Sequence, residues 1–281
     1  MNQHVGVDIG NSGVKAGLLD LANRQVRQPI RLSWKSLVSG KSLGDEKDRS
    51  RAFSPREQYW PERLVKELGL EGGSTQWWVG SVNRAATAQL CAYLQDYVNA
   101  GARIELLAAR DIDLGIDVEV PERVGIDRLL ATYAAACEFP ERPIIVVEAG
   151  TAVTVDLLRG GDHRRGVFCG GAIVPGMPLM MQMLEQGTDL LPGVNVAKQW
   201  QPPVIPAKRT EDAMLAGAFA ALVGGVVRLV DEYRHRCGED TRVVASGGDA
   251  DLFAPCLPGP LTKIDHLVLR GIAWHAARRA S

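Results

Sequence analysis

The sequence predicts an α/β fold built from two similar halves with a cleft between them. Apolar runs of strand length alternate with stretches whose apolar residues have helical spacing. Each half opens with a strand that ends in an acid, a small or apolar residue, a glycine and a hydroxyl or amide side chain, at residues 7–12 and 147–151. A length of 281 residues allows one large domain or two smaller ones. The repeated pattern favours two, residues 1–118 and 119–281.

The first half is expected to hold three consecutive strands and then alternating helices and strands. Apolar or alternating runs predict strands at residues 4–8, 14–20, 25–34, 76–82 and 103–107. Helical spacing of apolar residues predicts helices at residues 61–68 and 87–98. The segment 38–58 is polar, charged and contains glycine and serine, so it is predicted to be an exposed loop.

The second half repeats this order with longer helices. Helical spacing predicts helices at residues 125–137, 177–186, 211–236 and 267–279. Apolar runs predict strands at residues 143–147, 152–158, 165–169 and 241–245. A duplicated unit of three strands and a helix follows from the two series together.

Charge and composition argue against several classes of partner. The net charge is −1 and the isoelectric point is near 6.5, so neither nucleic acid nor an anionic membrane is expected as a partner. No basic segment followed by an apolar run opens the chain, and glycines break the longest apolar stretch, so a cytoplasmic location is expected. The five scattered cysteines show no zinc-binding spacing and predict buried, reduced thiols.

The first candidate site is the turn DIGNSGVK, residues 8–15. A glycine-bearing turn lets backbone N–H groups approach a phosphate without interference from a Cβ atom. The candidate phosphate ligands in the turn are Gly10, Asn11, Ser12 and Gly13. Lys15 can reach the outer phosphates as a point charge, and Asp8 can hold Mg²⁺ through water. The alternative is an ordinary glycine–asparagine hairpin.

The second candidate site is the turn EAGTAVTVD, residues 148–156. Gly150 and Thr151 can take the remaining phosphates, and Glu148 can help to hold a cation. This turn alone is also compatible with an ordinary hairpin. Two such turns, one at the start of each half and each preceded by an acid, favour a nucleotide-binding cleft. A further glycine turn at residues 246–249 could pack against an adenine ring.

A third motif, GIDR at residues 125–128, opens a predicted helix. A kinase that acts on an alcohol needs a carboxylate to accept the hydroxyl proton. Asp127 is the best-placed candidate, and Arg128 is a bidentate donor suited to a carboxylate. An acid is also common in the first turn of any helix, because the helix dipole stabilises it there.

These motifs together resemble the type III pantothenate kinase family, part of the sugar-kinase, heat-shock-ATPase and actin superfamily. The similar segments, from residue 5 to about 275, are DIGNSGVK, GSVN (80–83), GIDR, EAGTAVTVD, GGAIVPG (170–176), Leu191-Pro192, Thr210 and SGGDA (246–250). The resemblance implies duplicated actin-like, ribonuclease H-like domains with an ATP cleft between them. It implies transfer of phosphate from ATP to pantothenate, the opening step of coenzyme A synthesis.

The resemblance also implies roles for particular residues. Asp127 would be the general base, while residues 8–15 and Thr151 would bind ATP. Pantothenate would contact Gly125, Ile126, Asp127, Arg128 and Thr210. The family uses Mg²⁺ and a monovalent cation, K⁺ or NH₄⁺, for which the metal-site residues here would be Asp8 and Glu148. It works as a homodimer with the substrate pocket at the subunit interface.

Two positions depart from the family pattern. The acid of the second motif is usually aspartate, and here it is Glu148, one methylene longer. This change could shift or remove the monovalent cation site. Seven residues before Gly125 the family often has a tyrosine that contacts substrate, whereas this chain has Val118. The loss of that hydroxyl could weaken pantothenate binding.

Three alternatives stay open at this point. One is a regulatory or binding protein on the same scaffold without catalysis, against which the intact Asp8, Lys15 and Asp127 argue. Another is an ATPase activator protein that bridges an iron–sulfur cluster with cysteines, but no cluster motif is present. A third is a sugar kinase, for most of which the chain is short.

Overall fold

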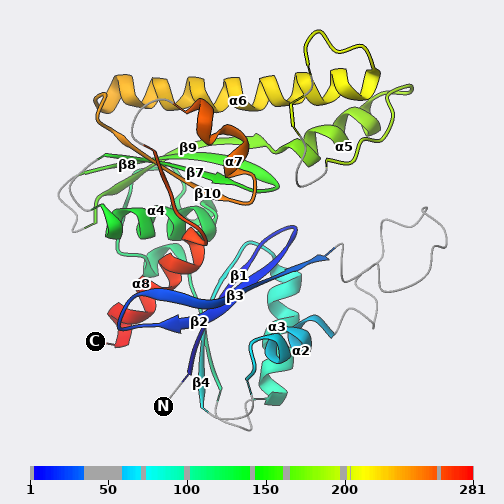
Figure 1. Cartoon of the computed structure of the whole chain (residues 1–281). Coiled ribbons are helices and arrows are strands. Elements are labelled where there is room, and N and C mark those ends of the chain that lie inside the picture. Colours follow the sequence, from blue (N-terminus) through cyan, green and yellow to red (C-terminus); the bar gives the residue numbers. More distant parts are fainter. Residues whose placement is uncertain are drawn as a thin grey trace. The chain divides into compact units, whose positions relative to one another are not determined.

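The computed structural model shows a chain that divides into two compact units (Figure 1). It describes residues 3–34, 59–70, 74–97, 102–139, 143–160, 165–196, 201–202, 204–257 and 261–280. Unit 1 comprises Met1–Asp113, Val120–Ala134 and His266–Ser281, and unit 2 comprises Leu114–Glu119 and Ala135–Asp265. The expected loop at residues 38–58 lies outside the described residues. The linear division into residues 1–118 and 119–281 stays a prediction.

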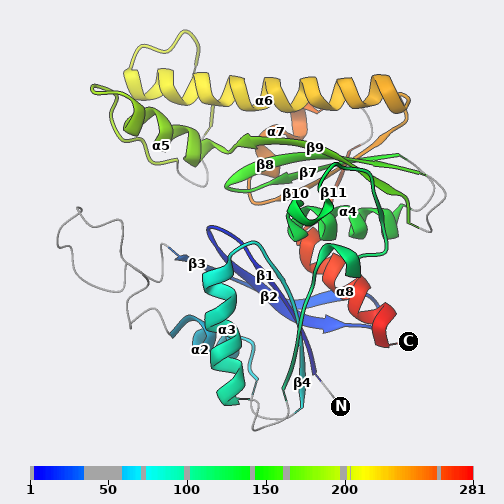
Figure 2. The same cartoon turned by 180° about the vertical axis from the view of Figure 1, so that it is seen from behind.

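Unit 1 contains a five-stranded sheet in the order β3-β2-β1-β4-β5. Its strands are β1 (Gln3–Ile9), β2 (Gly13–Asp20), β3 (Gln25–Ser33), β4 (Thr75–Ser81) and β5 (Arg103–Leu106). The first three strands pair antiparallel, whereas β4 runs parallel to β1 and β5 runs parallel to β4. Helices α2 (Tyr59–Glu67) and α3 (Arg84–Tyr97) cover one face and α8 (Leu267–Ala280) covers the other, as Figure 2 shows from behind.

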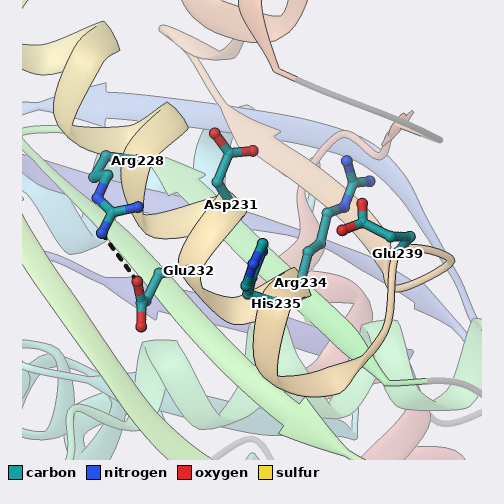
Figure 3. Close-up of a pocket in the computed structure, with 6 residues that line it drawn as sticks. All are labelled: Arg228, Asp231, Glu232, Arg234, His235 and Glu239. Carbon is teal, nitrogen blue, oxygen red and sulfur yellow. Dashed lines mark hydrogen bonds and ion pairs between the residues drawn. The ribbon is translucent and has the colours of Figure 1, made fainter.

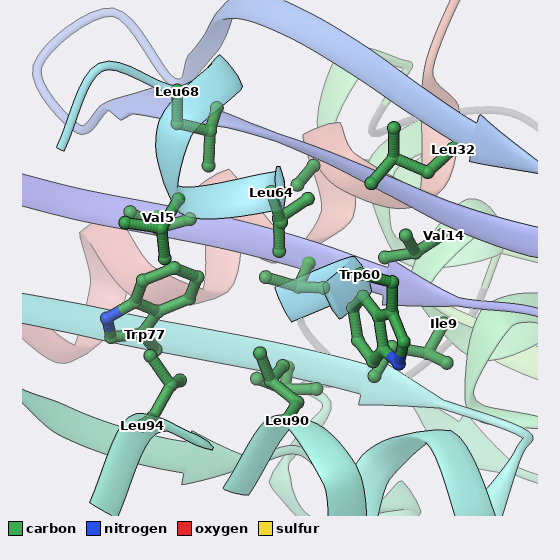
Figure 4. Packing of buried hydrophobic residues seen from close by; sticks show 14 of the residues in the cluster. Val5, Ile9, Val14, Leu32, Trp60, Leu64, Leu68, Trp77, Leu90 and Leu94 are labelled. Carbon is green, nitrogen blue, oxygen red and sulfur yellow. The ribbon is translucent and has the colours of Figure 1, made fainter. Parts of the chain in front are cut away.

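The alternation of side chains along β1 decides which residues enter the core of unit 1. Val5, Val7 and Ile9 point to the face covered by α2 and α3, where they pack in a cluster with Trp60 and Trp77 (Figure 4). Gly6 and Asp8 therefore point to the opposite face. There a Cβ atom on Gly6 would lie 2.7 Å from Leu19 Cδ2 and 3.4 Å from Ile272 Cγ2 in α8, so only glycine fits without a shift.

Unit 2 repeats this topology. Its sheet has the order β11-β10-β7-β8-β9-β6, so that β9-β8-β7-β10-β11 corresponds to β3-β2-β1-β4-β5. The strands are β6 (Gly115–Ile116), β7 (Ile144–Ala149), β8 (Ala152–Arg159), β9 (Val167–Pro175), β10 (Arg242–Gly247) and β11 (Leu261–Lys263). The pairs β7–β8 and β8–β9 are antiparallel, while β10 is parallel to β7 and to β11. The duplicated α/β prediction is therefore confirmed.

The helices of unit 2 include the longest helix of the described chain, α6. They are α5 (Met177–Gly187), α6 (Thr210–Cys237) and α7 (Ala250–Phe253), and α4 (Ile126–Glu138) begins in unit 1 and ends in unit 2. Met214, Ala218, Leu222, Val226 and Val230 recur every four residues along α6, and all are buried against the sheet. Of the described helices, α6 alone is long and apolar enough to span a membrane, a test that a core helix also passes.

Several element boundaries differ from the predictions for local physical reasons. Helix α3 begins at Arg84 rather than at residue 87, because Asn83 Oδ1 accepts a hydrogen bond from the Ala86 N–H (3.1 Å) and caps the helix. Strand β9 continues past residue 169 to Pro175 through two glycines. At Gly171 a Cβ atom would lie 2.3 Å from the Val155 carbonyl oxygen, so the absence of a side chain allows close pairing with β8. The short elements β6, β11 and α7 were not predicted.

One buried histidine makes the stability of unit 1 depend on pH. His275 lies in α8 with 1% of its surface exposed, and its ring packs edge-on against Trp78 with centroids 5.8 Å apart. Burial, together with the smaller effect of the nearby Arg278, lowers the pKa of His275 to about 4. The native protein therefore holds this side chain neutral at physiological pH.

We expect the protein to lose stability as the pH falls from 6.5 toward 4. An unfolded histidine binds its proton near pH 6.5, whereas the folded His275 does so only near pH 4. Between pH 7 and pH 5 the unfolding free energy should fall by about 2 kcal/mol more in the wild type than in His275→Gln. Urea unfolding at the two pH values measures this difference, and equal losses in the two proteins would contradict it.

Candidate active site

The first glycine turn of unit 1, between β1 and β2, is held in place by the end of β3 and by Trp34 directly after it. The Gly10 N–H donates a hydrogen bond to the Gly13 carbonyl (2.9 Å), which closes the turn between β1 and β2. Trp34 donates from Nε1 to the Gly10 carbonyl (3.2 Å) and from its backbone N–H to the Ser12 carbonyl (3.1 Å). A Cβ atom on Gly13 would lie 2.1 Å from the Leu32 carbonyl oxygen. The close approach of this backbone therefore requires glycine at position 13.

A buried carboxylate and a lysine lie at the base of this turn. Asp8 pairs with Lys15 across the β1–β2 ladder, and Lys15 Nζ lies 3.6 Å from Asp8 Oδ2. The Asp8 side chain is 9% exposed and that of Lys15 is 30% exposed. Burial raises the pKa of Asp8, Lys15 and Arg31 act to lower it, and the nearby Asp127 carboxylate raises it. Two carboxylates close together in a partly buried place are suited to a divalent cation.

Asp127 reaches this place from the first turn of α4. The Gly125 carbonyl accepts hydrogen bonds from the N–H groups of Arg128 (3.1 Å) and Leu129 (3.4 Å), which start the helix. Asp127 Oδ1 accepts the Arg128 N–H at 2.9 Å. A Cβ atom on Gly125 would lie 2.4 Å from that same Oδ1, so glycine leaves the space that the carboxylate occupies. Asp127 and Arg128 are both half-buried.

The start of α4 packs beside the carboxyl ends of two parallel strands. β1 and β4 pair in register from Gln3 with Thr75 to Ile9 with Ser81. The Val82 N–H then donates to the Ile9 carbonyl (3.0 Å). A Cβ atom on Gly80 would lie 2.7 Å from Leu130 Cδ1 of α4, so a glycine here lets the helix approach the strand. The carboxyl ends of parallel strands are the usual binding edge of α/β sheets.

The second glycine turn, in unit 2, is supported by two further glycines. The Gly150 N–H donates to the Ala152 carbonyl (3.1 Å), and the Gly176 N–H donates to the Thr151 carbonyl (2.9 Å). A Cβ atom on Gly176 would lie 2.6 Å from the Gly150 carbonyl oxygen, and one on Gly247 would lie 2.0 Å from the Ala149 carbonyl oxygen. Gly247 also has a φ of +97°, which favours glycine. The backbones at Gly176 and Gly247 therefore pack directly against this turn, and both positions require glycine.

The predicted site residues form two groups, one in each unit. In unit 1 the structure brings together Asp8, the turn 10–13, Lys15 and the segment 125–128. In unit 2 it brings Gly150 and Thr151 together with half-buried Glu148, which pairs with Ser246 in the β7–β10 ladder. Thr210 is exposed and is the first residue of α6.

Sequence reasoning missed two residues around the first turn, Arg31 and Trp34. Arg31 lies opposite Lys15 in the β2–β3 ladder and acts on Asp8. The spacing along the chain does not reveal this pairing, because an irregularity between Ala16 and Leu18 shifts the register of β3. Trp34 could have been singled out in the sequence only as an aromatic residue at the end of the third predicted strand.

A separate pocket lies at the carboxyl end of α6 and contains none of the predicted site residues (Figure 3). It is lined by charged side chains of both signs: Arg228, Asp231, Glu232, Arg234, His235 and Glu239. Arg228 pairs with Glu232 at 3.1 Å, and Arg234 donates to the Thr241 carbonyl. These interactions engage Arg228, Glu232 and Arg234 within unit 2.

The side chains near Asp8 limit how the protein could bind a divalent metal ion. No group of three or more histidine, cysteine, aspartate or glutamate side chains within the described parts of the chain is arranged to bind a metal ion. A divalent cation at Asp8 would therefore need ligands from a bound phosphate and from water. Mg²⁺ commonly binds in this way, through one or two carboxylates together with substrate phosphates.

The sequence of this chain is similar to those of known proteins. The family model described as type III pantothenate kinase matches residues 5–232. A protein of Rhodopirellula baltica named type III pantothenate kinase is 32% identical over 285 residues, covering 95% of this chain and 96% of the relative. A protein of the same name from Rhodospirillum rubrum is 38% identical over 164 residues, covering 58% of this chain and 61% of the relative.

Two solved structures share the fold at low sequence identity. A Campylobacter jejuni protein described as a Baf family transcriptional activator has a TM-score of 0.56 and 18% identity, covering 98% of both chains. A Sinorhizobium meliloti protein described as a 2-dehydro-3-deoxygalactonokinase has a TM-score of 0.55 and 13% identity, covering 99% of this chain and 96% of the other. At these identities the two structures bear on the fold alone.

Proposed function

Because the chain belongs to the type III pantothenate kinase family, we propose that Asp127 is the general base of its phosphoryl transfer. The reaction itself follows from the family: ATP phosphorylates pantothenate to 4′-phosphopantothenate, the opening step of coenzyme A synthesis. The observation that carries the assignment of Asp127 is its place at the start of α4, close enough to Asp8 to raise the pKa of that carboxyl. A base must lie beside the phosphate-binding groups in order to deprotonate a hydroxyl that attacks phosphorus.

The other residues of unit 1 supply positioning and charge. Lys15 places a positive charge beside the turn, where it would attract the negatively charged outer phosphates of ATP. The turn 10–13 offers backbone and neutral side-chain donors to the phosphate oxygens. Asp8 would hold a divalent cation through water, and such a cation neutralises charge that develops on the transferred phosphoryl group. Asp127 accepts the hydroxyl proton of the acceptor.

We further propose that pantothenate contacts Gly125, Ile126, Asp127, Arg128 and Thr210. The support is chemical: the substrate carries a carboxylate, and Arg128 offers a bidentate donor next to the proposed base. In unit 2 we propose that Gly150 and Thr151 are further phosphate ligands. The support there is the turn's similarity to the first one, since each is closed by a glycine N–H.

A monovalent cation and a homodimer complete the proposal. Glu148 is the proposed carboxylate for K⁺ or NH₄⁺, and its half-buried position at the end of β7 supports this role.

The proposed homodimer is supported by the surface of unit 2. Only 28% of the most apolar stretch of α6 is buried, and several large apolar side chains of unit 2 are exposed: Ile173, Met183, Leu190, Val204 and Ile205. Exposed apolar surface of this kind is typical of protein interfaces. A cytoplasmic location is proposed from the biosynthetic role.

The proposal is tested by an assay of ADP release with pantothenate and with a panel of sugars, each with and without K⁺. We expect turnover only with pantothenate, and faster turnover when K⁺ is present. Turnover with a sugar alone would favour a sugar kinase, and no turnover with any acceptor would favour a regulatory protein. Equal rates with and without K⁺ would remove Glu148 from the cation site without affecting the assignment of Asp127.

Replacing Gly125 with alanine should impair catalysis while the protein stays folded. The new Cβ atom would lie 2.4 Å from Asp127 Oδ1, so the carboxylate must move away from its position. We expect kcat to fall about tenfold, because a displaced base transfers protons less effectively. Steady-state kinetics and circular dichroism measure the two effects. The matched control is Gly217→Ala in α6, where a Cβ atom meets nothing within 4 Å and kcat should not change.

A further inference from the structure

Two cysteines and an arginine gather on one face of the unit 2 sheet, apart from the proposed active site. Arg159, at the end of β8, donates a hydrogen bond from Nε to Cys169 Sγ of β9 at 2.9 Å. The same guanidinium pairs with Asp117 at 2.9 Å, which holds the arginine in place. Cys237 is the last residue of α6. All five cysteines of the chain are free thiols in this structure.

The strand pattern places Cys169 on the face of the sheet that α6 covers. Leu158 and Phe168 pair across β8 and β9 and are buried, but they lie outside the cluster that packs against α6. Their chain neighbours therefore point to the opposite face, and Leu157 does belong to the α6 cluster. Arg159 and Cys169 consequently lie on the side of α6, which crosses this face of the sheet (Figures 1 and 2).

The helix geometry brings Cys237 to the same face. Tyr233, four residues earlier, donates a hydrogen bond from its hydroxyl to the Val155 carbonyl of β8 at 3.4 Å. Residues four apart share one side of a helix, so Cys237 also points toward the sheet. Burial raises the pKa of Cys237, the sulfur of Cys169 raises it further, and Arg159 lowers it. Both cysteines are half-buried, which leaves a small molecule access to them.

We propose that Cys169 and Cys237 form a dithiol that a peroxide oxidises reversibly to a disulfide. Reactive cysteines characteristically sit next to a cation and are partly exposed, and Arg159 gives Cys169 these surroundings. By contrast, Cys137 is buried and Cys256 is exposed rather than half-buried. The bond would join β9 to the end of α6.

The reaction balances with one peroxide molecule. The Cys169 sulfur attacks a peroxide oxygen, the O–O bond breaks and one water leaves, which gives a sulfenic acid. The Cys237 sulfur then attacks the Cys169 sulfur, the S–O bond breaks and a second water leaves. Two electrons pass from the two sulfurs to the peroxide. A thiol reductant reverses the change by disulfide exchange.

Mass spectrometry of the full-length protein after treatment with hydrogen peroxide tests the proposal. We expect the mass of two hydrogen atoms to be lost, a non-reduced digest to link the peptides of Cys169 and Cys237, and dithiothreitol to restore both thiols. Cys256→Ser is the control and should form the same link. In Cys237→Ser the sulfenic acid of Cys169 should instead persist and be trapped by dimedone. Oxidation of Cys256 while Cys169 and Cys237 both stay free would overturn the proposal.

The role of Arg159 is tested by the rate of oxidation. Arg159→Gln should slow disulfide formation about tenfold, because the cation beside the sulfur is lost. Arg159→Lys keeps the charge and should retain most of the rate. Circular dichroism verifies that both variants are folded. An unchanged rate in Arg159→Gln would remove the arginine from the proposal.

Discussion

Asp127→Asn should lower kcat for pantothenate phosphorylation by about 10² or more. The asparagine has nearly the same shape but accepts a proton poorly, so the attacking hydroxyl would lose its base. The KM values for ATP and pantothenate should change much less, since the backbone contacts at the start of α4 remain. Steady-state kinetics with both substrates measures this separation of kcat from KM.

A matched control exists on α6, where Asp231 is exposed and lies away from the proposed site. Asp231→Asn carries the same chemical change and should leave kcat unaltered. Full turnover in Asp127→Asn would exclude this carboxylate as the base.

Asp8→Asn should reduce kcat/KM for ATP by about 10² while leaving the fold as stable as before or more stable. Burial raises the pKa of Asp8, so the ionised side chain costs folding free energy at neutral pH, and the amide removes that cost. Lys15 is 30% exposed and can be solvated once its carboxylate partner is gone. Activity and stability are therefore expected to change in different directions.

Magnesium dependence and thermal unfolding separate these two effects. A higher Mg²⁺ concentration should be needed for half-maximal activity in Asp8→Asn, because one proposed ligand has lost its charge. The melting temperature without nucleotide should stay level or rise. Asp20→Asn is the contrasting control, since hydrogen bonds from Asn23 hold the pKa of that carboxyl below its usual range. This variant should lose some stability and keep its activity. A large loss of stability in Asp8→Asn would instead assign Asp8 a structural role.

The cysteines show how composition alone can mislead. Buried thiols were predicted from the general tendency of free cysteine, yet only Cys137 is buried, and Cys256 is exposed. The position of a thiol depends on the register of the strand that carries it. For Cys169 that register follows an irregularity in the β8–β9 pairing, which the local sequence does not reveal.

The sequence by itself determined most of the helices and strands, their duplication and the chemical candidates. Strands and helices follow from the spacing of apolar residues over a few neighbours, and the repeated acid–glycine turns mark Asp8 and Glu148 without reference to the rest of the chain. The tertiary structure decided which candidates act on one another. Asp8 and Asp127 are 119 positions apart in the chain (127 − 8), and only the packing of α4 on Gly80 at the end of β4 brings their charges close. Local spacing cannot report such contacts, because they depend on strand register and on close approaches between distant backbones.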